Sequence, residues 1–361
     1  MRLILPGDKS ISHRSLMLAA LGRGTSRVRG VLRSADIEST AAALRALGVN
    51  MPSLSNDELV IEGVGLRGLR APQGDLDCGN SGTTTRLMAG VVAGAGITAR
   101  FVGDASLSAR PMRRVAAPLE SLGARVDLPP HGGLPMTVHG AALRGGTWTP
   151  EAASAQIKSA ILLAGLVGNV PVEINEPAPT RDHTERMLRA RGVDVRTDGL
   201  VVTLVPNARL DAADVDVPGD PSSAAFFAGF AAMGGVAELA IANVCVNPGR
   251  VGAFRALLRM GAALKYEDTA DQGGEPVATV VIRSGVASDS VARGDAVTTA
   301  GLRGIAIDPD DVPSLIDELP LLACVAARAT GETRVTGAHE LRVKESDRIH
   351  AIVSNLRAVG A

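Results

Sequence analysis

LRALGVNM at residues 44–51 is the first of several stretches that decide the fold, because its pattern recurs along the chain. In each copy a leucine-rich helical turn ends at a glycine, where the C-terminus of a helix favours a left-handed residue. The other copies are LESLGARVDL at 119–128, LRARGVDVRT at 188–197 and LLRMGAALKY at 257–266. Each copy leads into a short extended run and then into a second strand-like run, at 58–63, 135–140, 200–206 and 278–284 respectively. The repeat is therefore a mixed α/β unit of roughly 70 residues, in which hairpin-like strands follow a helix.

Strand-like runs also precede the helices, at 2–5, 99–103 and 172–177. A fifth copy, LRAVGA at 356–361, stops where the other copies continue into paired strands. We therefore expect this sequence to be shorter than its complete architecture, with the last helix lacking its partner strands. At ~150 residues per domain, the length of 361 residues predicts two domains or three small ones.

Composition indicates a globular protein without the bulk charge that attracts nucleic acid or an anionic membrane. The chain is 46% hydrophobic and 21% charged, and its net charge is −1. Any anion that the protein binds must therefore be held by a local cluster of cations and hydrogen-bond donors. The apolar runs at 160–167 and 224–237 are shorter than the ~20 residues of a membrane-spanning helix. The 3 cysteines are too far apart for a CxxC-type zinc motif and do not suggest a disulfide framework. We expect a cytoplasmic monomer with no nucleic-acid or membrane partner.

Lysine is scarce, since Lys9, Lys158, Lys265 and Lys344 are the only lysines among 37 basic residues. Where arginine supplies almost every positive charge, a retained lysine marks a place that favours a compact, titratable ammonium. This singles out Lys9, Lys158 and Lys344 as candidate functional groups. The surroundings of Lys265 are more typical of a solvated surface.

The segment PGDKSISHRS at 6–15 brings Lys9, Ser10 and Arg14 together after the predicted first strand. A helix that begins near Ser10 or Ser12 would gather N–H groups, hydroxyls and a guanidinium around one point, as phosphate-binding sites do. The glycine pair of a Walker loop is absent from this segment. Taken alone, the segment is more typical of a capped surface helix.

A second anion-cradling loop is predicted in DCGNSGTTTRLMAG at 77–90, where Gly79 and Gly82 let a ligand approach the backbone ahead of Arg86. An ordinary capped turn explains the same pattern equally well. GDASLSARPMRR at 103–114 adds Arg110, Arg113 and Arg114, and we expect one of these arginines to face a ligand.

Two later segments place polar residues at helix starts. SAQIKSAILLAG at 154–165 has serine, glutamine and lysine in the first turn of an apolar helix, at the positive end of its dipole. TRDHTERM at 180–187 contains Arg181 and His183. We interpret His183 as a hydrogen-bonding residue, because no second histidine lies at metal-ligand spacing. We interpret GDPSSAAFF at 219–227 as a structural cap.

Candidate acid and base groups come late in the chain. Asp317 lies among leucine, isoleucine and proline in PSLIDELP at 313–320, where burial would perturb its pKa. In LRVKESDRI at 341–349, Lys344 beside Glu345 is a candidate acid/base pair. A solvated charge run is the commoner meaning of this second pattern.

Taken together, the segments resemble one family, 5-enolpyruvylshikimate-3-phosphate (EPSP) synthase, or 3-phosphoshikimate 1-carboxyvinyltransferase. GDKSISHR, GNSGTTTR, GDASLSARP, SAQIKSA, TRDHTERM and RVKESDR follow the order of that family at about its spacing. The resemblance implies an α/β fold of two similar domains built from repeated βαβαββ units, the inside-out α/β barrel of enolpyruvyl transferases. It implies a first domain of 1–7 with 219–361 and a second of 8–218, which close on the substrates without a metal or organic cofactor.

The resemblance also implies the substrates, shikimate 3-phosphate and phosphoenolpyruvate, and a role for each matched residue. Contacts with shikimate 3-phosphate are implied for Lys9, Ser10, Arg14, Ser154, Ala155, Gln156, Arg181 and Lys344. Contacts with phosphoenolpyruvate are implied for Lys9, Gly82, Arg110 and Gln156, and a contact with a substrate carboxylate is implied for Arg348. Asp317 matches the proton acceptor for the shikimate 5-hydroxyl, and Glu345 matches the proton donor to the phosphoenolpyruvate methylene.

Two alternatives stay open. UDP-N-acetylglucosamine enolpyruvyl transferase shares the fold and phosphoenolpyruvate, but usually carries a cysteine in the loop matching 103–110 and an asparagine after the N-terminal lysine. This chain has no cysteine in that loop and has Ser10 after Lys9. The EPSP synthase pattern also continues past residue 361 with a histidine-arginine motif and a lysine that contact phosphoenolpyruvate, so a noncatalytic fragment that binds shikimate 3-phosphate is the second alternative. Whether glyphosate inhibits the chain is left open.

Overall fold

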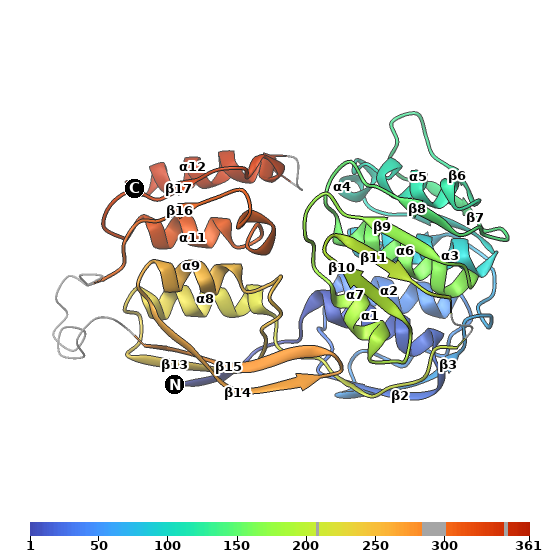
Figure 1. Cartoon of the computed structure of the whole chain (residues 1–361), viewed down its shortest axis with the longest axis horizontal. Helices are drawn as coiled ribbons and strands as arrows, with labels where there is room; N and C mark the ends of the chain where they lie inside the picture. The colour runs from blue at the N-terminus through green and yellow to red at the C-terminus, as the bar shows by residue number, and fades with distance from the viewer. Residues whose placement is uncertain (207–208, 284–300, 343–345) are drawn as a thin grey trace. The chain divides into compact units, whose positions relative to one another are not determined.

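The computed structural model describes residues 1–206, 209–283, 301–342 and 346–361 (Figure 1). Their contacts divide the chain into two compact units. Unit 1 consists of Met1–Pro6, Pro218–Asp271 and Glu275–Ala361, and unit 2 consists of Gly7–Val217 and Gln272–Gly274. Each unit combines mixed sheets with helices, so the predicted α/β class is confirmed.

Unit 2 holds most of the predicted binding segments. Its described helices are α1 (Lys9–Leu21), α2 (Ala35–Ala46), α3 (Gly82–Ala95), α4 (Ala105–Ser108), α5 (Arg113–Ser121), α6 (Ala155–Gly168) and α7 (His183–Arg189). Its described strands are β2 (Arg23–Arg29), β3 (Glu58–Val64), β4 (Leu76–Asp77), β5 (Thr98–Val102), β6 (Arg125–Asp127), β7 (Met136–His139), β8 (Gly146–Trp148), β9 (Val172–Asn175), β10 (Val195–Asp198), β11 (Val201–Leu204) and β12 (Val215–Asp216).

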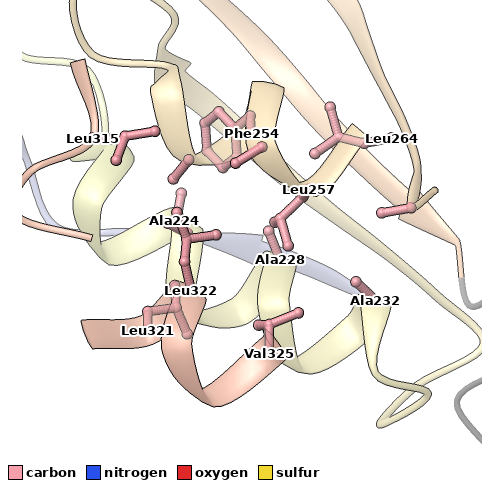
Figure 2. Close-up of a cluster of buried hydrophobic side chains, with 14 of the residues drawn as sticks. Ala224, Ala228, Ala232, Phe254, Leu257, Leu264, Leu315, Leu321, Leu322 and Val325 are labelled. Atoms are coloured by element: carbon pink, nitrogen blue, oxygen red, sulfur yellow. The ribbon is translucent and has the colours of Figure 1, made fainter. Parts of the chain in front are cut away.

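Unit 1 has the same kinds of element. Its described helices are α8 (Pro221–Ala232), α9 (Gly252–Arg259), α11 (Leu319–Ala326), α12 (Arg348–Ala358) and the short 3₁₀ turns η1 (Val312–Ser314) and η2 (His339–Arg342). Its described strands are β1 (Arg2–Ile4), β13 (Glu238–Cys245), β14 (Ala263–Gln272), β15 (Glu275–Arg283), β16 (Ala306–Ile307) and β17 (Arg334–Val335). Figure 2 shows part of its apolar core, where Ala224 and Ala228 of α8, Phe254 and Leu257 of α9, and Leu322 and Val325 of α11 are buried in one cluster.

The repeat predicted from the sequence is confirmed. The backbone φ angles of Gly48, Gly123, Gly192, Gly261 and Gly360 are all positive, at 93°, 108°, 77°, 99° and 82°. Four of the five described sheets repeat one pattern, because in each of the four a parallel strand pair continues into an antiparallel pair. Their strand orders are β12-β2-β3, β4-β5-β7-β6, β8-β9-β11-β10 and β1-β13-β15-β14.

The first extended run predicted after Gly48 is wrong, because residues 49–57 contain no strand, whereas the second run, predicted at 58–63, is confirmed as β3. In the other copies β6, β10 and β14 follow the glycine, whereas β3 pairs with β2 instead. The physical reason lies in Pro52 and Arg45. Proline has no N–H to donate to a sheet, and the Arg45 guanidinium donates to the carbonyl oxygens of Met51 and Pro52 at 3.0 and 2.9 Å.

No described helix is long and apolar enough to cross a membrane. Cys78 and Cys245 are buried and Cys324 is exposed, and all of them are free thiols. Burial is the main cause that raises the pKa of the Cys78 thiol to about 12, so this thiol stays protonated at neutral pH.

Helices α3 and α6 pack closely, and glycine makes this possible. A Cβ atom added to Gly90 would lie 2.1 Å from the Ala160 carbonyl oxygen, and one added to Gly94 would lie 2.6 Å from the Ala164 carbonyl oxygen. The backbone of α3 therefore touches the backbone of α6, which leaves no room for a side chain. This contact fixes the distance between the side chains at the N-terminal ends of the two helices.

Replacing Gly90 by alanine is expected to destabilise the protein by about 1–3 kcal/mol, because the added methyl group must push α3 and α6 apart. Urea unfolding followed by circular dichroism measures this loss. Gly74→Ala is the matched control, since a Cβ there meets nothing within 4 Å. Equal stability of the two variants would contradict the backbone contact between α3 and α6.

Candidate active site

The first turn of α1 carries the N-terminal cluster. The sequence predicts a start near Ser10 or Ser12, and the helix begins at Lys9 because Asp8 caps it. The Ile11 N–H donates to Asp8 Oδ1 at 2.8 Å. Lys9 is half exposed, and its Nζ donates to Asp36 Oδ2 on α2 at 3.0 Å. The ammonium is therefore held at the surface of unit 2, while Ser10 is partly buried beside it.

Arg14 is buried and connects three helices. Its Nε donates to Thr184 Oγ1 on α7 at 2.7 Å, and its Nη2 donates to Ser159 Oγ on α6 at 2.7 Å. Its Nη1 donates to the Ser10 carbonyl oxygen at 2.9 Å. Arg14 thus joins α1 to α6 and α7 in this structure, and its contact with a substrate stays a prediction.

The loop before α3 and the start of α6 form a second polar cluster. Arg86 Nη1 donates to Gln156 Oε1 at 2.8 Å, and Gln156 Nε2 donates to Thr83 Oγ1 at 2.9 Å. A Cβ atom added to Gly82 would lie 2.6 Å from Arg86 Nη1 and 3.4 Å from Arg110 Nη1. Two guanidinium groups therefore converge on the backbone of a residue without a side chain. Such an arrangement suits an anion that approaches the N-terminus of α3.

Arg110 is the arginine of segment 103–114 that reaches this cluster. Its Nη2 donates to Asn80 Oδ1, and Asn80 Nδ2 donates to Asp104 Oδ2 at 2.6 Å. The Leu107 N–H and the Asn80 amide lower the pKa of Asp104, so the carboxylate is ionised and holds Asn80 in place. Arg113 instead forms an exposed ion pair with Glu120. Arg110 is therefore the arginine of this segment that we expect to face a ligand.

Asp36 connects the two clusters. Its side chain accepts from Lys9, and its carbonyl oxygen accepts from Thr84 Oγ1 in the first turn of α3 at 3.3 Å. The N-terminal ends of α1, α2 and α3 are thereby linked by hydrogen bonds. The network therefore joins Lys9 to the first turn of α3, which begins at Gly82.

Helix α6 begins as predicted, with Ser154 as its cap. Ser154 Oγ accepts from the Ile157 N–H at 3.4 Å, and Ser154, Ala155 and Gln156 are all partly exposed. Arg181 is also partly exposed and lies just before α7, whose first residue is the buried His183. Because Thr184 of α7 contacts Ser159 of α6 at 2.7 Å, the Arg181 segment is tied to α6.

Lys158 does not join the polar cluster around Gln156. It lies on the buried side of α6, where Nζ forms ion pairs with Glu176 at 2.8 Å and Glu185 at 2.7 Å. Burial is the main cause that raises the pKa of Glu185, against the opposing effect of Lys158. Lysine scarcity marked Lys158 as a special residue, and the structure gives it a structural role.

The predicted acid and base groups belong to unit 1. Arg348 Nη1 donates to Asp317 Oδ1 at 3.1 Å, and the Asp317 side chain is 35% exposed. Asp317 is therefore paired rather than buried, and the neighbouring Glu318 takes the buried place, bonded to Ser222. Lys344 and Glu345 lie outside the described residues.

The interpretation of 219–227 as a cap is supported by the Ser222 N–H, which donates to Asp220 Oδ1 at 2.8 Å.

A chain of buried hydroxyls supports the N-terminal helices from inside. His13 Nδ1 is hydrogen-bonded to Thr40 Oγ1, and Thr40 Oγ1 to Thr84 Oγ1, each at 2.7 Å. His13 is fully buried, and its Nε2 has no hydrogen-bond partner among the residues that the structure describes. Burial, followed by the charges of Arg14 and Lys9, lowers the pKa of His13 to about 3.

His13→Asn is expected to weaken the acid sensitivity of folding. Because the folded-state pKa of His13 lies below its unfolded value, the histidine contributes stability above about pH 6.5 and loses it as the pH falls toward 3. Between about pH 7.5 and pH 5, the unsubstituted chain should therefore lose about 2 kcal/mol more of its free energy of unfolding than the variant loses. Urea unfolding at both pH values measures this difference. The exposed His131→Asn is the control, and parallel pH profiles for His13→Asn and the unsubstituted chain would contradict a buried neutral histidine.

Sequence reasoning missed Asp36 and Thr184 as parts of the site and noted Arg86 without giving it a role. A signal existed for Arg86, the one arginine in the first turns of an otherwise uncharged helix. Asp36 carried no such signal, because it lies 27 residues from Lys9 and is one of 38 acidic residues.

Comparisons with known proteins agree with the sequence motifs over the whole chain. A family model described as EPSP synthase (3-phosphoshikimate 1-carboxyvinyltransferase) matches residues 2–361. A 3-phosphoshikimate 1-carboxyvinyltransferase of Xanthomonas campestris pv. campestris is 47% identical over 359 residues, which cover 99% of this chain and 78% of that protein. The protein of the same name from Acidithiobacillus ferrooxidans is 46% identical over 360 residues, covering 100% of this chain and 79% of that protein. A solved structure of EPSP synthase from Acinetobacter baumannii has a TM-score of 0.86 and 43% identity, covering 99% of this chain and 78% of that one.

Proposed function

The chain belongs to the EPSP synthase family, and we propose that it performs the family's reaction with the residues gathered at the N-terminal ends of α1, α3 and α6. That reaction transfers the enolpyruvyl group of phosphoenolpyruvate to the 5-hydroxyl of shikimate 3-phosphate and releases phosphate, on the chorismate route to aromatic amino acids. The observation that carries the proposal is the hydrogen-bonded network that links Lys9 to the start of α3, and Gln156 to that same helix.

Shikimate 3-phosphate is proposed to bind where helix starts offer donors. Ser154, Ala155 and Gln156 supply N–H groups, a hydroxyl and an amide at the positive end of the 14-residue α6. Ser10 and Arg14 add donors from α1, and the Arg181 segment is tied to α6 through α7. A doubly charged phosphate fits this set, because the set contains cations and neutral donors with few competing carboxylates.

Phosphoenolpyruvate is proposed to bind beside Gly82, where Arg110 and Lys9 supply positive charge and Gln156 supplies an N–H donor. Asp36 holds the Lys9 ammonium at 3.0 Å, and its carboxylate must give way or share the ammonium when an anion arrives. Preorganised charges of this kind stabilise charge that develops in a transition state. Arg348 of unit 1 is proposed to contact a substrate carboxylate.

The chemistry requires one base and one acid. Asp317 is proposed to accept the proton of the shikimate 5-hydroxyl, whose oxygen bonds to C2 of phosphoenolpyruvate while Glu345 protonates C3. The resulting tetrahedral ketal then loses a proton from the same methyl carbon and expels phosphate, which restores the carbon–carbon double bond. In unit 1 the Arg348 guanidinium lies 3.1 Å from the Asp317 carboxylate that is proposed to take the 5-hydroxyl proton. Lys344 is proposed to contact shikimate 3-phosphate.

The proposal extends to organisation and location. Residues 1–7 with 219–361 are proposed to form one domain and residues 8–218 the other. We also propose a cytoplasmic monomer that binds no nucleic acid, consistent with its net charge of −1 and its free cysteines.

Release of inorganic phosphate from phosphoenolpyruvate tests the proposed function. The expected result is release that requires shikimate 3-phosphate and does not occur with UDP-N-acetylglucosamine. Release with the nucleotide sugar alone would favour the rival transferase and overturn the proposal. Binding of shikimate 3-phosphate in titration calorimetry without phosphate release would instead favour the noncatalytic alternative.

A further inference from the structure

The carboxamide of Gln156 has a defined orientation, and Arg86 sets it. A carboxamide offers one oxygen that accepts and one NH₂ group that donates. A guanidinium group has only donors, so the atom that faces Arg86 Nη1 at 2.8 Å has to be the oxygen. The NH₂ group must then lie on the other side, where one of its N–H groups donates to Thr83 Oγ1 at 2.9 Å. Thr83 alone could not make this choice, because a hydroxyl both donates and accepts.

We propose that Arg86 is a positioning residue that turns Gln156 into a donor toward an anionic substrate. This inference rests on the proposed function, in which Gln156 contacts phosphate or carboxylate groups. Ionised phosphates and carboxylates only accept hydrogen bonds, so Gln156 assists binding only when its NH₂ group faces them. With the amide reversed, its oxygen would face the anion and repel it. Arg86 removes this second orientation before the substrate arrives.

Rigid helices support the role of Arg86. Arg86 lies in α3 and Gln156 in the first turn of α6, and these helices touch through Gly90 and Gly94. Two side chains that reach across such a contact keep their separation, because neither helix can shift without breaking the close packing. The Arg86 guanidinium also lies against the bare backbone of Gly82, so no side chain at Gly82 displaces it from Gln156.

A double-mutant cycle separates this role from a direct contact between Arg86 and the substrate. The four proteins are the unsubstituted chain, Arg86→Met, Gln156→Ala and the double variant, and the measured quantity is kcat/KM for phosphoenolpyruvate. Each single substitution is expected to lower kcat/KM by ~10-fold or more, since a hydrogen bond to a charged group is lost or misdirected. The double variant is expected to equal Gln156→Ala, because Arg86 has nothing left to orient.

Two further variants complete the test. Arg86→Lys keeps a side chain that only donates and is expected to recover part of the loss, and it replaces Arg86→Met in the cycle should the latter fail to fold. Arg125→Met removes an exposed arginine of β6 and is expected to leave kcat/KM unchanged, which controls for the lost charge. Losses that multiply in the double variant would overturn the proposal. Absence of both binding and turnover in the unsubstituted chain would instead overturn the proposed function on which the inference rests.

Discussion

Replacing Lys158 by methionine is expected to lower the free energy of unfolding by about 3–5 kcal/mol, because it leaves two carboxylates buried without their cation. Lys158, Glu176 and Glu185 have side-chain exposures of only 2%, 7% and 1%. Methionine fills nearly the same volume, so the loss reflects charge rather than packing. Urea unfolding near neutral pH measures the change.

The pH dependence of the Lys158→Met variant gives the same account a second test. Burial already raises the pKa of Glu185 in the folded state, and the loss of Lys158 removes the opposing effect. A carboxyl group with a raised folded-state pKa contributes stability at low pH and loses it as the pH rises. Acidification toward about pH 5 should therefore restore part of the lost stability.

Matched variants show whether the loss of the buried ion pairs causes the lower stability of Lys158→Met. Lys265→Met removes an exposed lysine paired with Glu267 and is expected to cost no more than about 1 kcal/mol. Adding Glu176→Gln and Glu185→Gln to Lys158→Met should recover stability, since no uncompensated charge remains. If Lys158→Met and Lys265→Met unfolded at the same urea concentration, the result would contradict a stabilising role for the buried ion pairs of Lys158.

Lys9→Met is expected to reduce kcat/KM for phosphoenolpyruvate by ~10²–10³-fold, the range seen when one preorganised donor is removed from an active site. The same variant should change the free energy of unfolding by no more than about 1 kcal/mol, because Lys9 is half exposed and its pair with Asp36 is accessible to solvent. Steady-state phosphate release and urea unfolding measure the two effects. Lys265→Met again serves as the control, with both quantities near those of the unsubstituted chain.

The contrast between Lys9 and Lys158 defines what the lysine substitutions should show. One lysine is expected to matter for turnover and little for stability, and the other chiefly for stability. A Lys9→Met variant that keeps its kcat/KM would remove Lys9 from the proposed site. A Lys9→Met variant that unfolds as readily as Lys158→Met would show that the pair with Asp36 is structural.

The repeated architecture could be predicted from the sequence because its signals are local. A glycine after a helix, as at Gly123 or Gly192, requires only that residue's own backbone freedom. The same holds for the start of α6, where the Ser154 hydroxyl accepts from the Ile157 N–H three residues later. The missing strand at 49–57 shows the limit of local signals, since Arg45 occupies the carbonyl groups that a strand would use.

The partners of the site residues could not be predicted in this way. Arg86 and Gln156 are 70 residues apart, and their contact depends on how α3 packs against α6. Lysine scarcity pointed to Lys158, but only the fold shows that two glutamates surround it. Asp317 and Glu318 are neighbours in the sequence, yet Glu318 is buried and the Asp317 side chain is 35% exposed. Which of two adjacent side chains is buried depends on the packing of unit 1, and the local sequence does not show it.

A crystal structure of the chain with both shikimate 3-phosphate and phosphoenolpyruvate bound would show where the two substrates lie. We expect phosphoenolpyruvate in contact with Lys9, Arg110 and the Gln156 NH₂ group, and the shikimate phosphate at the N-terminal end of α6. Ligands bound away from the starts of α1, α3 and α6, with Lys9 and Arg110 contacting neither of them, would contradict this expectation.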